Sequence, residues 1–145
     1  MRGIKFRGFN PKNNQWLYGF YLQNRGAHFV CPDEFANGKS WDDYEVDPET
    51  VGQFTGLTDK NGREIYDGDV VKVYSKRRKP AEDPYEGQTP VVIFRQACFS
   101  LMMDDGNHMT MKRAEHLYDF EIISNIHDNP EYWLPKNRNI KPLNL

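Results

Sequence analysis

The chain has 145 residues, the size of a single domain that can bury a substantial core. Its 19 basic and 21 acidic residues give a net charge of −2, which excludes a global field that would attract nucleic acid or an anionic membrane. No apolar run is long enough for a membrane span or a secretion signal, so we expect a cytoplasmic protein with no membrane partner. Cys31 and Cys98 follow no CxxC spacing, and we expect both to remain thiols.

The composition favours sheet over helix. Aromatic residues make up 14% of the chain, whereas alanine and leucine are scarce. Strand-like segments recur between turns, which predicts a mainly β fold whose antiparallel strands form a partly open barrel or sandwich. We expect one domain over residues 1–135, followed by a C-terminal tail over residues 136–145.

The first part of the chain predicts two hairpins. IKFRGF (4–9) alternates apolar and basic residues, and a turn separates it from the aromatic strand WLYGFYL (16–22). Gly19 within that strand indicates a bulge or a close backbone approach. The sequence NRG then leads into AHFVCP (27–32), and a surface loop follows over residues 33–44.

Residues 50–74, TVGQFTGLTDKNGREIYDGDVVKVY, contain four residues that we interpret as structural turn formers. Asp59, Asn61 and Gly62 form a tight reversal in which the last two tolerate positive φ. Gly68 lies in the next turn, which leads into an alternating strand ending at Tyr74.

The second half predicts further strands and a short helix. Residues 75–90 are rich in proline and charge and predict a mobile loop, and residues 91–103 predict one bent or bulged strand. A turn over 104–107 and a helical turn around 114–118 follow, then a strand that is buried on both faces. Asp128 or Asn129 caps a short C-terminal helix that begins at Pro130.

The order of these segments resembles the YopX family of phage and prophage proteins. Four segments between Ile4 and Glu131 carry the resemblance: IKFRGF, WLYGFYL, VDPETVGQFTGLTDKNGREIYDGDVVKV and FEIISNIHDNPE. The resemblance implies a mainly β protein of a phage or prophage in a bacterial host cell, and one that self-associates. It implies no activity and no catalytic residues.

Catalytic and metal sites find little support in the sequence. Acids beside the DKNG turn suggest calcium, but their spacing differs from the twelve-residue calcium loop. No spacing requires His28, Cys31, Cys98 and His108 to share a zinc ion. The acidic pairs 42–43 and 104–105 are adjacent, so on strands their side chains would point to opposite faces. We expect a non-enzymatic protein without a cofactor or metal.

Two binding functions remain open. The favoured one is a phage accessory protein that acts by homo-oligomerisation or by binding a host or phage protein. Its interface would use strand edges and five aromatic residues: Trp16, Tyr18, Phe20, Tyr132 and Trp133. Alternatively, the segment around 132–134 folds back and covers the other aromatics within one chain.

The second binding function is a small nucleic-acid-associated β-barrel module. The observation that supports this function is the run Lys76, Arg77, Arg78 and Lys79, because mobile cations can neutralise phosphates with little demand on geometry. Three acids between residues 82 and 86 would partly cancel the field of this run.

Overall fold

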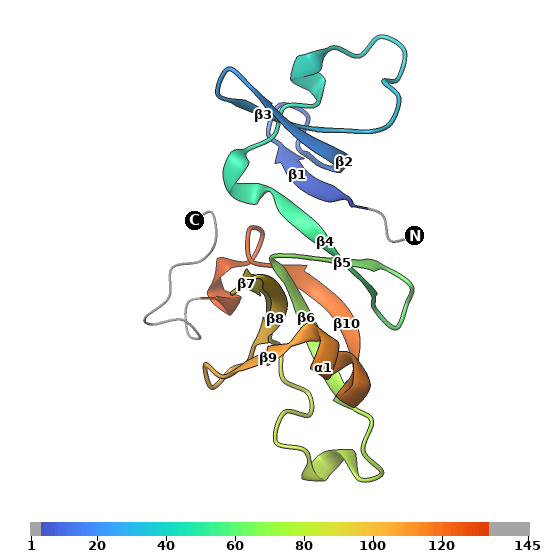
Figure 1. The fold of residues 1–145 in the computed structure, drawn as a ribbon, viewed down its shortest axis with the longest axis vertical. Coiled ribbons are helices and arrows are strands. Elements are labelled where there is room, and N and C mark those ends of the chain that lie inside the picture. The colour runs from blue at the N-terminus through green and yellow to red at the C-terminus, as the bar shows by residue number, and fades with distance from the viewer. Residues whose placement is uncertain (1–3, 134–145) are drawn as a thin grey trace.

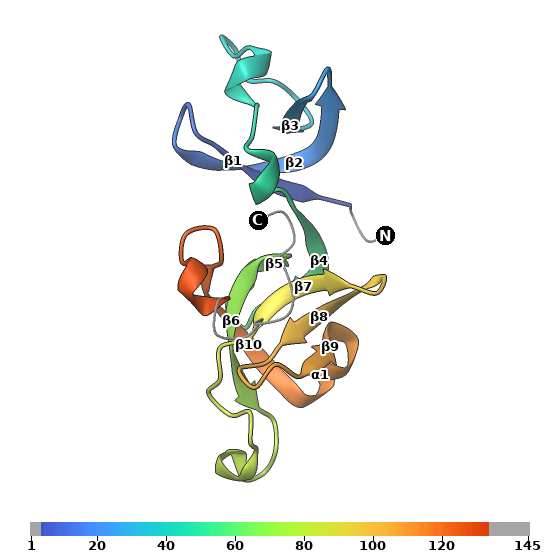
Figure 2. The same cartoon turned by 90° about the vertical axis from the view of Figure 1, so that its left-hand side faces the viewer.

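The computed structural model describes residues 4–133, which form two five-stranded antiparallel sheets and one short α-helix. Figure 1 shows the sheets one above the other, with β4 running from the upper sheet towards the lower, and Figure 2 shows the same stacking from the side. Neither sheet is closed. The predicted mainly β fold, with a short helix near the C-terminus, is therefore confirmed.

The N-terminal sheet has the order β3-β2-β1-β4-β5. Its strands are β1 (Phe6–Asn10), β2 (Gln15–Asn24), β3 (Ala27–Cys31), β4 (Gly52–Thr58) and β5 (Glu64–Tyr66). The close approach predicted at Gly19 is present, because a Cβ added there would lie 1.9 Å from the carbonyl oxygen of Cys31. The absence of a side chain at this position lets the start of β2 pair with β1 while its end pairs with β3.

The outer edge of β3 is covered by its own chain. The amide of Val30 donates to the carbonyl of Tyr44, and the amide of Val46 donates to the carbonyl of His28. On the other sheet, the amide of Lys60 donates to the carbonyl of Phe120 in the outermost strand. These hydrogen bonds cover part of the outer edges of β3 and of that outermost strand, and the expected interface through strand edges stays a prediction.

The C-terminal sheet has the order β10-β6-β7-β8-β9. Its elements are β6 (Asp69–Ser75), β7 (Val91–Arg95), β8 (Cys98–Met102), β9 (His108–Thr110), α1 (Met111–Leu117) and β10 (Tyr118–Asn125). The single strand predicted over 91–103 is wrong, because the chain reverses between β7 and β8. Gln96 and Ala97 make this turn with φ of 51° and 64°, the backbone of a two-residue hairpin without its usual Asn-Gly.

The C-terminal strand and the final helix also differ from the prediction. Burial alternates at the start of β10, where Tyr118 and Phe120 are buried and Asp119 is exposed, so this part is not buried on both faces. The segment that begins at Pro130 is a 3₁₀ turn, Pro130–Tyr132, and the side chain of Asn129 accepts no capping hydrogen bond from its backbone, although it donates to the side chain of Glu131. The predicted tail over 136–145 lies outside the described residues.

Most of the apolar core belongs to the C-terminal sheet. One buried cluster lies between this sheet and α1 and includes Val71, Leu101 and Phe120. A second gathers around Trp133 and includes Val70 and Ile126. Among the described residues, no helix is long and apolar enough to cross a membrane.

The segment predicted as a mobile loop packs on the domain. Asp83 is only 6% exposed, and it accepts hydrogen bonds from the hydroxyls of Ser75 and Tyr118 at 2.8 and 2.9 Å. The amide of Val73 also donates to the carbonyl of Gln88. Sequence composition misjudged this loop because a buried aspartate with hydroxyl partners looks like any other charged loop residue.

Candidate binding site

A cleft of about 320 Å³ lies between the two sheets. One wall comes from β1 and β2, and the other comes from β10 and the turn after it. Its lining includes Arg7, Trp16, Tyr18, Arg63, Ile123 and Asp128. Pockets at the junction of two substructures are a common place for binding sites.

A buried ion pair forms the floor of the cleft. Arg7 on β1 and Asp69 on β6 are 5% and 2% exposed, and Arg7 Nη1 donates to Asp69 Oδ1 at 2.6 Å. The guanidinium lies 4.9 Å from the ring of Trp16 and 5.2 Å from the ring of Tyr66. This pair therefore connects the two sheets through charge and through aromatic stacking.

Strand β2 exposes aromatic surface at the cleft and beyond it, because Tyr18 lines the cleft and Phe20 follows it along the strand outside the lining. Tyr18 and Phe20 are 49% and 44% exposed, and they lie on one face of β2 because alternate residues of a strand share a face. Across the cleft, Ile123 on β10 is 39% exposed. Tyr18 is held in place against Tyr66, with ring centroids 5.5 Å apart.

Two exposed and opposite charges also line the cleft, Arg63 after the DKNG turn and Asp128 after β10. Neither forms an ion pair with another described residue. Arg63 Nη1 donates a long hydrogen bond of 3.5 Å to the carbonyl of Ile122, and Asp128 Oδ2 accepts from the side-chain Nδ2 of Asn125 at 2.9 Å. Both charges are thus available to a bound molecule.

Two titratable groups behind the floor have shifted pKa values. Burial raises the pKa of Asp67 to about 7; the nearby Arg7 opposes this shift and Asp69 adds to it. Burial also lowers the pKa of His127 to about 4, and the positive charge of Arg7 adds to that shift. His127 is therefore neutral at neutral pH, and its ring packs against Trp16.

The five predicted interface residues do not lie on one surface. Trp16, Tyr18 and Phe20 follow one face of β2, but Trp133 is 2% exposed and belongs to the core. Tyr132 packs against the same core cluster. The assignment of Trp133 to an interface is wrong, because the turn at Pro130 directs the indole into the C-terminal core. Trp133 does not reach the pocket lined by Trp16 and Tyr18, which leaves the β2 aromatics uncovered by it.

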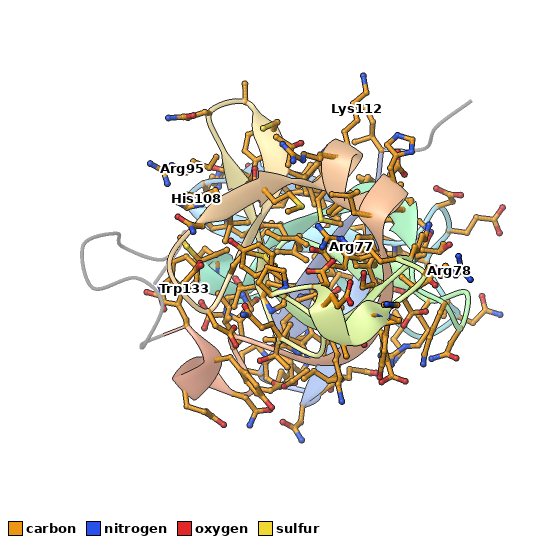
Figure 3. All side chains as sticks on the ribbon, turned by 90° about the horizontal axis from the view of Figure 1, so that it is seen from below. Arg77, Arg78, Arg95, His108, Lys112 and Trp133 are labelled. Carbon is orange, nitrogen blue, oxygen red and sulfur yellow. The ribbon has the colours of Figure 1, made fainter. Side chains whose placement is uncertain are left out.

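The predicted basic run lies at the lower end of the molecule, where three of its four cations meet acids. Lys76 lies 3.8 Å from Asp119, Arg77 lies 3.4 Å from Asp83, and Lys79 lies 3.6 Å from Glu82. Figure 3 shows Arg78 on the side opposite Arg95, so these two cations do not gather into one patch. The cleft residues Arg7, Arg63 and Asp128 were not predicted as site residues, since nothing in their spacing connects them; Asp128 was considered only as a helix cap.

The predicted turn residues lie in turns. Asp59 Oδ1 accepts hydrogen bonds from the amides of Asn61 and Arg63, and Gly62 has a φ of 81°. Gly68, with a φ of 93°, lies in the turn between β5 and β6. Within residues 4–133, no group of three or more potential ligands is placed to hold a metal ion.

The sequence model described as "YopX protein" matches residues 5–133. The chain belongs to the YopX family. A search of curated proteins found no match. Among solved structures, the crystal structure of protein EF1440 from Enterococcus faecalis is similar: the identity is 24%, the TM-score is 0.55, and the alignment covers 90% of this chain and 98% of that one. This similarity supports the YopX fold and brings no function with it.

Proposed function

We propose that this YopX protein is a non-enzymatic binding protein that self-associates through the face around the cleft. The observation that carries the proposal is the exposed row Tyr18 and Phe20 on β2, opposite Ile123 on β10. Large aromatic residues on a rigid strand give contact area at a low entropy cost, and aromatic residues are enriched in protein interfaces. The partly covered edges of β3 and β10 favour association through a face over association through strand pairing.

A second copy of the chain suits this face because its exposed charges are self-complementary. In a two-fold dimer, residue i of one copy meets residue j of the other, and the reverse contact forms as well. Arg63 and Asp128 can therefore pair twice across the interface, around an apolar centre. Host or phage proteins are the alternative occupants of the same face.

Light scattering coupled to size exclusion tests the proposal. Wild-type protein is expected to exceed the 17.1 kDa of one chain at micromolar concentration. The double variant Tyr18→Ser/Phe20→Ser is expected to be a folded monomer, because it removes the exposed aromatic side chains of the interface and replaces no core residue. Leu117→Ser is a matched control, since it removes a side chain that is 37% exposed on α1, away from the cleft. A wild-type mass of 17.1 kDa at all concentrations would refute self-association.

The nucleic-acid alternative receives less support. Pairing with acids reduces the field of the basic loop, and the counterion release that drives phosphate binding needs uncompensated cations. A mobility shift at low salt, with Arg77→Ala/Arg78→Ala as the comparison, tests this alternative. A complex that the variant fails to form would favour the basic loop over the cleft.

A further inference from the structure

The turn between β5 and β6 is bonded to both sheets at once. The amide of Asp67 donates to the carbonyl of Gln53 on β4 at 3.0 Å, and the amide of Gly68 donates to the carbonyl of Val92 on β7 at 2.8 Å. Arg7 Nη2 on β1 also donates to the carbonyl of Asp67 at 3.3 Å. Any change in this turn is therefore transmitted to both sheets.

The charges at this turn do not balance when every group is ionised. Asp69 uses its two oxygens for Arg7 Nη1 and for the amide of Tyr66, at 2.6 and 2.8 Å. Asp67 has no ion pair of its own within the described chain, and only the amide of Phe94 provides a hydrogen bond that favours its charge. Two carboxylates would then share one guanidinium in a site from which most water is excluded.

The surroundings of Asp67 offer no second cation. A cavity of about 10 Å³ beside it is lined mainly by apolar side chains of Val51, Ile93, Ile126 and Trp133. His127 lines the same cavity but is neutral at neutral pH, and the acids Asp47 and Asp128 only partly offset its desolvation. Arg63 acts on Asp69 from the solvent side of the junction. A proton on Asp67 is the simplest way to neutralise the excess charge.

We propose that the Asp67–Gly68 turn is a proton-linked latch between the two sheets, closed when the Asp67 carboxyl holds a proton and loosened when that proton leaves. The negative charge left on Asp67 repels Asp69 and is held away from water while the turn is closed, and the attraction of Arg7 offsets this cost only in part. The hydrogen bonds from Asp67 to Gln53 and from Gly68 to Val92 then open more often. The latch is independent of self-association, although Trp16 and Tyr18 of the proposed interface pack on the same groups.

Carbon-detected NMR of the Asp67 carboxyl over pH 4 to 9 tests the first part of the proposal. The expected midpoint is near 7, compared with about 3.9 for an ordinary aspartate. Hydrogen-exchange protection of the Asp67 and Gly68 amides, corrected for intrinsic rates, tests the second part. Protection is expected to fall as pH rises through this midpoint, by up to about tenfold per pH unit for one linked proton.

The variant Asp67→Asn, whose amide mimics the protonated acid, is expected to abolish the fall in protection that the wild type shows as pH rises. Asp119→Asn removes an exposed acid on β10 and is expected to behave like the wild type. A midpoint near 4, or a midpoint near 7 with constant protection at both amides, would overturn the latch. Should Asp67→Asn not fold, the wild-type measurements alone decide.

Discussion

The two sheets of this protein are stabilised in different ways. The C-terminal sheet encloses apolar clusters built from residues such as Val71, Leu101 and Trp133. Neither cluster contains a residue of β1, β2 or β3, and the buried residues of β1 include Arg7 and Asn10. The comparison teaches that the N-terminal sheet has a smaller apolar core, with Val30, Cys31 and Val46 buried, and depends more on close backbone contacts and on its polar junction with the other sheet, while Tyr18 and Phe20 stay exposed.

The largest expected effect comes from breaking the junction. Arg7→Leu should lower the free energy of unfolding by about 3–5 kcal/mol, because it leaves the buried carboxylate of Asp69 without its partner. Chemical denaturation measures the change. The control Lys60→Leu removes an ion pair between partly exposed side chains and should cost less than about 1 kcal/mol. Equal losses of stability in the two variants would show that the Arg7–Asp69 pair contributes no more to stability than the Lys60–Glu121 pair.

A local break in the N-terminal sheet is expected from Gly19→Ala. The added Cβ would meet the carbonyl oxygen of Cys31 at 1.9 Å, and backbone rather than a flexible side chain would have to move, at a cost of about 3 kcal/mol or more. Hydrogen exchange should show lost protection in β2 and β3 while β6 to β8 remain protected. Gly26→Ala is the matched control, because nothing lies within 4 Å of its added Cβ and only the positive φ is strained. Uniform loss of protection in both sheets would contradict the conclusion that the two sheets are stabilised in different ways.

A smaller effect is expected in the C-terminal part from Tyr118→Phe. The change removes one of the hydrogen bonds to the buried carboxylate of Asp83 and should cost about 1–2 kcal/mol. It should also raise proteolytic cleavage between residues 76 and 90, since Tyr118 helps to fix this segment. Tyr85→Phe removes a hydroxyl whose hydrogen bonds are exposed and serves as the control. Unchanged cleavage and stability in Tyr118→Phe would mean that the remaining contacts, such as those of Ser75 and Arg77 with Asp83, hold the segment without Tyr118.

The smallest net effect is predicted for pH, because two groups at the junction oppose each other. Asp67 has a raised pKa of about 7 in the folded state, so its stabilising contribution is full below about pH 3.9 and is lost as pH rises through 7. His127 has a lowered pKa of about 4, so protonation of the unfolded state costs stability as pH falls below about 6.5. Between pH 4 and 6.5 the two contributions nearly cancel.

Single substitutions should uncover each contribution. Relative to the wild type, the free energy of unfolding of Asp67→Asn should increase as pH rises from 4.5 to 6.5, and that of His127→Gln should decrease over the same range. Each slope is at most about 1.4 kcal/mol per pH unit. Urea unfolding at fixed pH steps measures both slopes. Slopes of the same sign would show that the pKa assignments are wrong.

The sequence was most informative where structure is set locally. The DKNG reversal and the close approach at Gly19 depend on residue types whose backbone preferences are strong, and both are present. The hairpin at Gln96 and Ala97 was missed because neither residue favours positive φ, so strand pairing on both sides imposes the turn.

The candidate site was not predictable in the same way. Arg7 and Asp69 are 62 positions apart, and nothing in a single sequence pairs them. Only the aromatic residues of the cleft, Trp16 and Tyr18, were visible, as part of an alternating pattern that continues to Phe20. Trp133 has the same amphipathic chemistry, yet the turn at Pro130 buries it. Periodicity thus identified a face, whereas tertiary packing decided which aromatic residues belong to it.

A reciprocal charge exchange tests self-association through the cleft face most directly. Arg63→Asp and Asp128→Arg each place like charges opposite each other twice in a two-fold dimer, so at low salt each variant alone should have a mass near 17.1 kDa. A 1:1 mixture of the two variants restores both opposite-charge contacts. Light scattering should then give about 34 kDa, twice the 17.1 kDa of one chain. A mixture that stays at 17.1 kDa, or single variants that associate as the wild type does, would contradict the proposed interface.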